Sequence, residues 1–180
     1  MKRLIPPLLA AALLAFVTLP AHAASKEELD AKVDEAMTEL FKHSSAAKEL
    51  AAKAAGILIF PEVTKGGIGI GGEYGEGALQ IGGKTVAYYN TVSGSIGFQL
   101  GLQQKSQAIL FMTKKEFDKF QKSDGWKAGV DGSVALATLG AGGQIDTETA
   151  KKPIIGFIYS NKGLMYNLTF EGSKITKIDK

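Results

Sequence analysis

The stretch from Gly56 to Leu79, which reads GILIFPEVTKGGIGIGGEYGEGAL, decides how the rest of the chain folds. It opens with a short apolar run that stops at Pro61, as in a strand that ends or lies at a sheet edge. Beyond it, Ile68 and Ile70 share one face of an extended segment, while glycines alternate onto the other face. Repeated glycines on one face indicate that a strand, a helix or a ligand approaches the backbone closely, or that the sheet bends sharply.

A second segment, residues 95–102, has the same character. Large apolar residues alternate with small and polar ones, so that one face carries Ile96, Phe98, Leu100 and Leu102, and the other carries Ser95, Gly97, Gln99 and Gly101. Two smooth-faced strands of this kind are expected to lie together. A tightly curved antiparallel sheet or a small barrel would use both of them.

The first 23 residues predict a secretory signal peptide that is cleaved after Ala23. A basic start is followed by an apolar run from Leu8 to Val17 and by a small-x-small cleavage site, Ala21-His22-Ala23. The apolar run is shorter than the roughly 20 residues that a membrane span requires. No cysteine follows, so no lipid anchor is expected, and the predicted location is periplasmic or secreted. Residues 24–180 are then predicted to form a single domain.

Charge and composition exclude several classes of function. The 21 basic and 18 acidic residues nearly balance once cleavage removes Lys2 and Arg3, so bulk charge does not favour nucleic acid as a partner. Arg3 is the only arginine, so an anion site in the mature chain must use lysines, backbone N–H groups or helix N-termini. Without cysteine, the fold must rest on its core and not on disulfides.

Helical patterns come first in the mature chain. Ser25 and Glu28 form a capping box ahead of an apolar stripe, which predicts an amphipathic helix packed on the sheet. Its polar face is acidic, whereas a helix that inserts into a membrane surface would be rich in lysine. An alanine-rich helix is predicted over about residues 46–55, capped by Ser44 or Ser45 and ended by Gly56. Its small side chains suggest that it lies on the bare glycine face.

Strands are predicted over most of the remaining chain. Gly82-Gly83 predicts a two-residue hairpin turn, and Thr113 with Glu116 predicts the start of a short helix whose lysines face outward. The predicted strands are residues 56–60, 66–72, 77–81, 85–90, 95–102, 107–112, 153–159, 164–170 and 173–178, with strand and loop between 128 and 143. This order predicts the α+β class: N-terminal helices packed on a curved, mainly antiparallel sheet or small barrel, with one further short helix.

Familiar catalytic and cofactor motifs do not fit this chain. The G-x-G-x-x-G match at residues 67–72 lacks the helix that must follow it, and residues 78–85, which resemble a phosphate-binding loop, are better explained by the hairpin. His43 is the only histidine after the predicted cleavage site, so no hydrolytic site, metal site or cofactor is expected. Glu73 and Glu76 are the carboxylate pair of most interest, and pairing with lysine or solvation is the expected role for them.

The glycine stretch resembles the signature of the SYLF domain family. The matching motifs are residues 55–61, 65–67, 75–77, 95–101, 159–164 and 171–173, which occur in the family's order between about Leu40 and Ile178. The resemblance implies a lipid-binding module, because family members bind phospholipids, eukaryotic relatives prefer phosphoinositides, and a yeast relative also binds actin. It supplies no catalytic residues. Eukaryotic members carry a membrane-seeking helix before the domain, where this chain has a predicted signal peptide and an acidic helix.

The leading hypothesis is an exported, non-enzymatic module that binds anionic phospholipid or a membrane surface at the cell envelope. Lipid headgroups would be held by lysines beside glycine turns and on the short helix: Lys65, Lys84, Lys114, Lys115, Lys119 and Lys122. Two alternatives stay open. One is a carrier whose barrel interior holds an apolar small ligand, and the other is an envelope interaction module whose glycine face receives a protein partner. Nucleotide and nucleic acid are not expected as partners.

Overall fold

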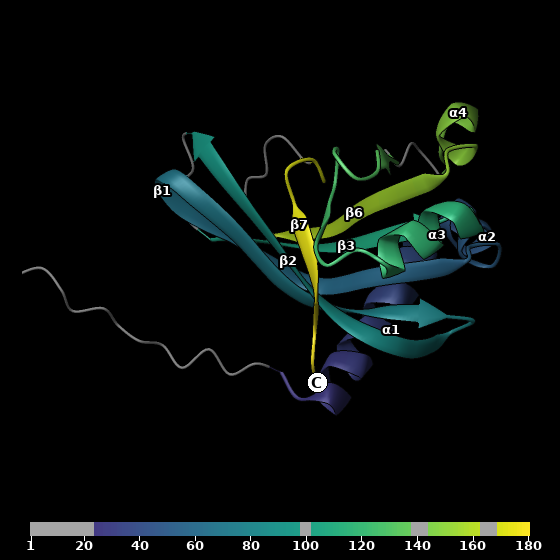
Figure 1. Cartoon of the computed structure of the whole chain (residues 1–180), viewed down its shortest axis with the longest axis horizontal. Coiled ribbons are helices and arrows are strands. Elements are labelled where there is room, and N and C mark those ends of the chain that lie inside the picture. Colours follow the sequence, from purple (N-terminus) through teal and green to yellow (C-terminus); the bar gives the residue numbers. More distant parts are fainter. Residues whose placement is uncertain (1–23, 98–101, 138–143, 163–168) are drawn as a thin grey trace, which may run out of the picture.

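Alternating apolar residues and glycine turns build one strongly curved sheet with helices on both of its faces (Figure 1). The computed structural model describes residues 24–97, 102–137, 144–162 and 169–180, with the backbone alone at residues 68–70 and 95–97. The predicted signal peptide and most of the strand predicted at residues 164–170 lie outside this description. So do the side-chain faces predicted for the Ile68 and Ile96 segments.

The sheet has seven strands in the order β4-β7-β2-β1-β3-β6-β5. Neighbouring strands are antiparallel except for the parallel pair of β5 and β6. The strand bounds are β1 Gly56–Ile81, β2 Lys84–Gly97, β3 Gln103–Phe111, β4 Trp126–Lys127, β5 Ala135–Leu136, β6 Ile154–Lys162 and β7 Lys174–Ile178. The predicted α+β class and curved, mainly antiparallel sheet are confirmed.

The two glycine-rich segments pair as predicted. β1 runs antiparallel to β2, with Gly69 opposite Gly97 and Ile70 opposite Ile96. Gly82 and Gly83, with φ of 55° and 77°, form the turn between them, which confirms the predicted hairpin. Three strands that the sequence analysis separated are one continuous β1, whose first half pairs with β3 and whose second half pairs with β2.

Glycines allow β1 to lie against itself. A Cβ built on Gly77 would overlap the carbonyl oxygen of Ile59, and one built on Gly75 would lie 2.7 Å from the carbonyl oxygen of Glu62. The element that approaches this bare face is therefore the first half of the same strand. The proposed packing of the alanine-rich helix on the glycines is not what covers Gly75 and Gly77.

The sheet separates two apolar layers, because successive side chains of a strand point to opposite faces. On the inner face, Phe60 and Leu79 pack with Phe111, Phe120 and other side chains in one cluster. On the outer face, the sequence neighbours Ile59 and Ala78 pack with Leu29, Val33 and Met37 of the first helix. Each buried Val, Leu, Ile, Phe or Met side chain among them contributes about 1.5–3 kcal/mol of hydrophobic stabilisation.

The outer face is covered by helices α1 (Lys26–His43) and α2 (Ser45–Ala51). The Ser25 hydroxyl accepts a hydrogen bond of 3.1 Å from the Glu28 N–H, which confirms the predicted cap of α1. Ser44 caps α2, and Ala47 of that helix packs in the cluster of Ala108, Leu110 and Phe157. The predicted end of this helix at Gly56 is wrong, since α2 stops at Ala51 and Gly56 begins β1.

The inner face is closed by helix α3 (Lys114–Gln121), whose Thr113 cap was predicted. Phe120 stacks against Phe111 with ring centroids 4.7 Å apart and against Tyr89 at 5.0 Å, while Trp126 meets both phenylalanines edge-on. These rings fill the apolar end of the curved sheet. A short helix, α4 (Thr147–Ala150), was not predicted.

Candidate functional site

The six lysines predicted to hold lipid headgroups lie in three separate places. Lys65 sits inside the curved sheet, where its side chain is only 13% exposed and its Nζ lies 3.5 Å from Glu73. Lys84 is exposed beside the Gly82-Gly83 turn. The remaining members are exposed on α3 or at its end: Lys114, Lys115, Lys119 and Lys122. A single headgroup site formed by all six is therefore not assembled.

Two of the four lysines on or next to α3 make local polar contacts. Lys114 Nζ lies 2.7 Å from a carboxylate oxygen of Asp118, one turn along the helix. The Lys119 ammonium donates to the backbone carbonyl of Asp131. Asp131 in turn accepts a hydrogen bond of 2.7 Å from the Lys127 N–H, which ties the end of α3 to β4. Lys115 and Lys122 remain exposed to solvent.

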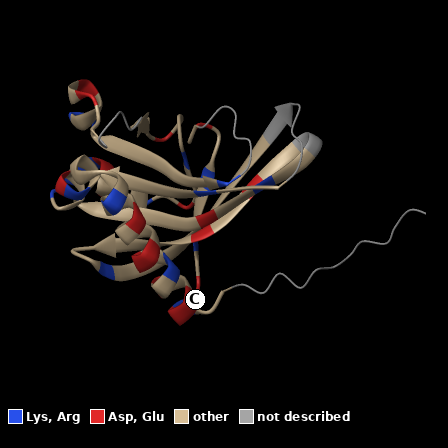
Figure 2. Ribbon diagram, turned by 180° about the vertical axis from the view of Figure 1, so that it is seen from behind, with Lys and Arg blue, Asp and Glu red and all other residues tan. Residues whose placement is uncertain are grey.

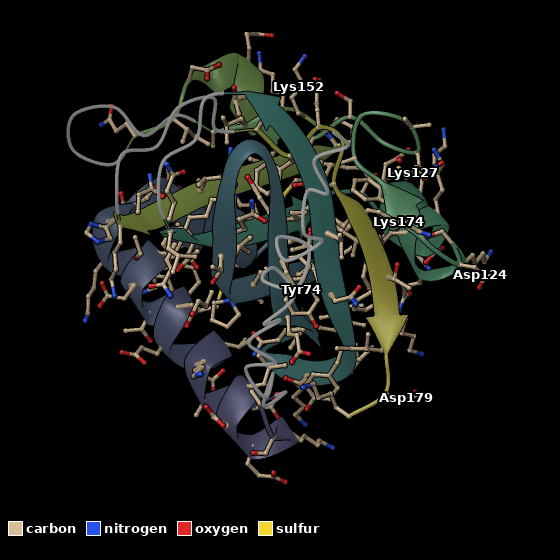
Figure 3. All side chains as sticks on the ribbon, turned by 90° about the vertical axis from the view of Figure 1, so that its left-hand side faces the viewer. Tyr74, Asp124, Lys127, Lys152, Lys174 and Asp179 are labelled. Atoms are coloured by element: carbon tan, nitrogen blue, oxygen red, sulfur yellow. The ribbon has the colours of Figure 1, made fainter. Side chains whose placement is uncertain are left out.

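Strand register creates a row of residues that sequence reasoning missed. Lys127 of β4 lies opposite Lys174 of β7, Lys174 lies opposite Val92 of β2, and Val92 lies opposite Tyr74 of β1. Directly opposite residues of an antiparallel sheet share a face, so this row places two lysines beside two apolar side chains. All of them are exposed, with Tyr74 at 50% and Val92 at 47%, and Figure 3 shows Tyr74, Lys127 and Lys174 on the side facing the viewer.

A groove opens next to this row, between α1 and β1. Its volume is about 670 Å³, and its lining includes Leu29 and Lys32 of α1, Pro61 and Thr64 of the first half of β1, Tyr74, Val92 and Leu102. Leu102 is 77% exposed at the groove, where it and Tyr74 present apolar surface to solvent. The groove is large enough for part of an acyl chain and belongs to the outer face of the sheet, alongside the N-terminal half of α1.

Charges around the groove are largely paired. Glu76 accepts hydrogen bonds from the Tyr74 hydroxyl at 2.8 Å and from the Lys180 ammonium at 2.5 Å. Burial, together with the hydrogen bond to Glu76, raises the pKa of Tyr74. Lys32 lies 2.9 Å from Glu28, and this hydrogen bond raises the pKa of the lysine. The expectation that Glu76 pairs with a lysine is confirmed.

Glu73 also lines the groove, and its carboxylate reaches the interior of the curved sheet. There it lies 2.8 Å from the ammonium of Lys105, whose side chain is only 2% exposed, and 3.5 Å from Lys65. Glu73, like Glu76, is therefore paired with lysine. Sequence reasoning missed Lys105, because nothing in the local pattern of β3 marks it as buried.

The acidic face of α1 has a structural role. Asp30 accepts hydrogen bonds from the hydroxyls of Thr85 at 3.0 Å and Tyr88 at 2.9 Å, and Asp34 accepts one from Gln80 at 3.2 Å. Burial, with the hydrogen bond to Asp30, raises the pKa of Tyr88 to about 12. These bonds dock α1 on the hairpin of β1 and β2. Figure 2 shows this charged helix lying against the strands. The preferred interpretation of α1 as a packing helix is confirmed.

The described residues contain no cluster of three or more His, Cys, Asp and Glu side chains that could hold a metal ion. Within the same part of the chain, no helix is long and apolar enough to cross a membrane. His43 lies 3.7 Å from Glu39 at the exposed end of α1, away from the groove and the interior lysines.

The second half of the chain matches a known protein family. The model of a family described as "Ysc84: Las17-binding protein actin regulator" matches residues 92–180, which include β2 from Val92 onward, α3 and the strands up to β7. This SYLF domain match is consistent with the SYLF domain family, and it contains the motifs at residues 95–101, 159–164 and 171–173, so the resemblance is confirmed. SYLF domains are binding modules and are not known as enzymes. A search of curated proteins found no match.

Proposed function

We propose that this SYLF domain is an exported phospholipid-binding module that docks on membranes of the cell envelope through the outer face of its sheet. The observation that carries the proposal is the cross-strand row in which Lys127 and Lys174 stand beside Val92 and Tyr74. Apolar side chains can enter the acyl region while neighbouring lysines contact anionic headgroups, which is the chemistry of a membrane interface. The groove beside the row would accommodate part of one lipid chain.

The groove supports this assignment better than the interior of the sheet does. Seven aromatic side chains belong to the apolar cluster of the interior: Phe60, Tyr89, Phe111, Phe117, Phe120, Trp126 and Phe170. An acyl chain would have to displace them, whereas the groove already presents Tyr74, Val92 and Leu102 to solvent. Exposed apolar groups that gather in this way mark an interaction surface. The family description names actin regulation, a role that the proposed export would separate from a cytoplasmic partner.

The test is co-sedimentation of the mature protein with vesicles of graded anionic lipid content, at low and physiological salt. Replacing Tyr74 and Val92 together with serine should remove about 1 kcal/mol or more of membrane affinity per side chain, because their apolar area is lost. Val86→Ser is the matched control, since Val86 lies on the same strand as Val92 with almost the same exposure, 51%, but outside the groove.

The charged part of the row is tested separately. Lys127→Gln combined with Lys174→Gln should weaken binding to anionic vesicles by about 1 kcal/mol per lysine, or about fivefold each, and most of this loss should disappear at high salt. Lys152→Gln, at an exposed lysine away from the row, should bind as the wild type does. Equal vesicle binding by the wild type and both row variants would refute the docking face.

The two other candidate functions predict different results in the same assays. A small-ligand carrier would take up a fluorescent fatty acid with saturable one-to-one stoichiometry and would not sediment with vesicles. A protein interaction module would do neither. The groove variants Tyr74→Ser and Val92→Ser separate the first two, because a carrier that uses the groove would lose fatty-acid uptake while vesicle binding stays absent throughout.

Export forms part of the proposal and rests on the three-part sequence pattern at residues 1–23. Expression of the full chain in a bacterium, followed by fractionation, should recover the protein outside the cytoplasm. Its N-terminal sequence should begin at Ala24. Recovery of a chain that still carries residues 1–23 from the cytoplasm would refute export.

A further inference from the structure

The interior of the curved sheet carries a buried cluster with more positive than negative charge. Lys65 and Lys105 share the single carboxylate of Glu73, and the three side chains are only 13%, 2% and 12% exposed. They come from three neighbouring strand segments: the two halves of β1 and β3. Two ammonium groups on one carboxylate leave one unbalanced positive charge in a place where water has little access.

No acidic side chain elsewhere in the sequence can be assigned to this charge. Residues 98–101, 138–143 and 163–168, which the structure does not describe, contain no Asp or Glu, and neither do residues 1–23. Every carboxylate side chain therefore belongs to the described residues, where Glu73 is the carboxylate within ion-pair distance of Lys65 and Lys105. Burying an unbalanced charge costs several kcal/mol unless a partner compensates for it.

An unused hydrogen-bond donor lies on the same face. Gln107 is two residues from Lys105 along β3, so their side chains point to the same side of the strand. Gln107 is 2% exposed, and its side-chain Nε2 has no hydrogen-bond partner among the described residues. A buried amide donor left without an acceptor costs about 1–3 kcal/mol, so the site lacks an acceptor as well as a negative charge.

We propose that this cluster is an anion-binding site for a singly or doubly charged oxyanion of the phosphate class. The anion would accept hydrogen bonds from Lys105, Lys65 and the Gln107 amide, which together offer positive charge and donors but no further acceptor. Glu73 bridges the two lysines and sets the net charge to be neutralised. The limited exposure of Lys65 and Glu73 gives the route from solvent. Glu73 also lines the groove, but Lys65, Lys105 and Gln107 do not, and the site does not require the membrane row.

Two sources of the same chemistry are distinguished by the choice of probe. Inorganic phosphate is titrated into the mature protein by calorimetry at constant ionic strength, and dihexanoylphosphatidylglycerol is titrated below its micelle concentration. Binding of phosphate alone identifies a soluble anion, and binding of both probes with the same dependence on the variants below identifies a lipid phosphodiester. Either result supports the site, and absence of binding of both probes overturns it.

Variants test whether the binding occurs at the cluster. Gln107→Leu, which removes the unused donor with little change of size, should weaken phosphate binding about tenfold, since a hydrogen bond to a charged group is lost. Lys105→Met should abolish binding. Glu73→Gln keeps the shape of the side chain, removes the competing carboxylate and should strengthen binding about tenfold. Lys152→Met, at an exposed lysine just after α4, is the control.

The sign of the Glu73→Gln effect separates anion binding from a purely structural ion pair. A structural role predicts that this variant loses stability and gains no affinity for phosphate. The proposal predicts that phosphate raises the melting temperature of Glu73→Gln more than that of the wild type. Lys105→Met can fail to fold, so the expected loss of phosphate binding is judged from Gln107→Leu alone. Undiminished phosphate binding by Gln107→Leu, together with no gain in Glu73→Gln, would overturn the assignment.

Discussion

Gly77→Ala should destabilise the fold strongly, although it adds a single methyl group to a strand. The Cβ of an alanine at this position would overlap the backbone carbonyl oxygen of Ile59 and lie 2.6 Å from a ring carbon of Phe60. Phe60 is fully buried in the inner cluster and has no room to retreat. The methyl group can therefore be accommodated only if the two halves of β1 move apart.

The magnitude follows from what such a movement disturbs. Overpacking a well-filled core costs about 1–3 kcal/mol, occasionally more. Here the obstacle is backbone, so the upper end of that range, about 3 kcal/mol, is the expected loss in the free energy of unfolding. For a domain of this size, each kcal/mol lowers the melting temperature by about 2–4 °C, which predicts a decrease of roughly 10 °C.

Gly94→Ala provides the matched control. Gly94 lies on β2, opposite Gly72 in the same glycine-rich sheet, and a Cβ built on it meets no atom within 4 Å. Since glycine in a strand is destabilising by about 0.5–1 kcal/mol relative to alanine, this variant should be unchanged or slightly more stable. Urea denaturation followed by tryptophan fluorescence measures both variants. Equal stability of Gly77→Ala and the wild type would refute the close approach of the two halves of β1.

Three further predictions concern the caps, the tyrosines and the α3 lysines. Ser44→Ala should lose about 1 kcal/mol in urea denaturation, because the buried Ser44 hydroxyl caps α2 at 3.0 Å from the Ala47 N–H, whereas the exposed Ser45→Ala should not. Folding raises the pKa of the Tyr88 hydroxyl from 10.0 to about 12. The folded state therefore binds this proton more tightly than the unfolded state, and the contribution to the free energy of unfolding is complete below pH 10 and is lost between pH 10 and 12. Tyr88→Phe should show a smaller alkaline loss of stability, and an identical loss would contradict this role. Replacing Lys114, Lys115, Lys119 and Lys122 with glutamine should weaken binding to anionic vesicles at low salt if the headgroup site first predicted is used, and unchanged binding would exclude it.

Local patterns predicted those parts of the fold that local interactions determine. The caps at Ser25 and Thr113 follow from hydroxyls that lie three residues before a backbone N–H in the first turn of the helix, where no carbonyl of the same helix can accept from it. The hairpin follows from two glycines with positive φ. The continuity of β1 was not predicted, because Pro61 looked like a strand end. In the structure β1 instead has an irregularity in its pairing with β3 between Phe60 and Val63, and the strand continues past the proline.

The candidate sites depend on contacts between distant residues, and this explains why they were missed. The polar run Gln103 to Gln107 looks like a solvated strand end, yet the return of β1 covers it and buries Lys105 and Gln107. Likewise, Lys174 and Val92 become neighbours only through the register of β7 and β2. By contrast, Glu73 and Glu76 could be flagged from sequence, because two carboxylates within a glycine-rich strand stand out wherever their partners lie.

Two basic surfaces are candidates for the membrane contact: the row with Lys127 and Lys174, and the lysines of α3. Substitutions can distinguish them. α1 packs against Ile59 and Ala78, and α3 packs against their sequence neighbours Phe60 and Leu79, so the two helices cover opposite faces of the sheet. The groove and the row of Lys127 and Lys174 lie on the face of α1, whereas the first predicted lysines lie on α3. The two surfaces meet at β4, where Lys119 of α3 and Lys127 of the row share Asp131 as a hydrogen-bond partner. If the row carries the docking, the substitutions at Tyr74 and Val92 should therefore weaken vesicle binding more than the four α3 substitutions do, and the opposite order would favour α3.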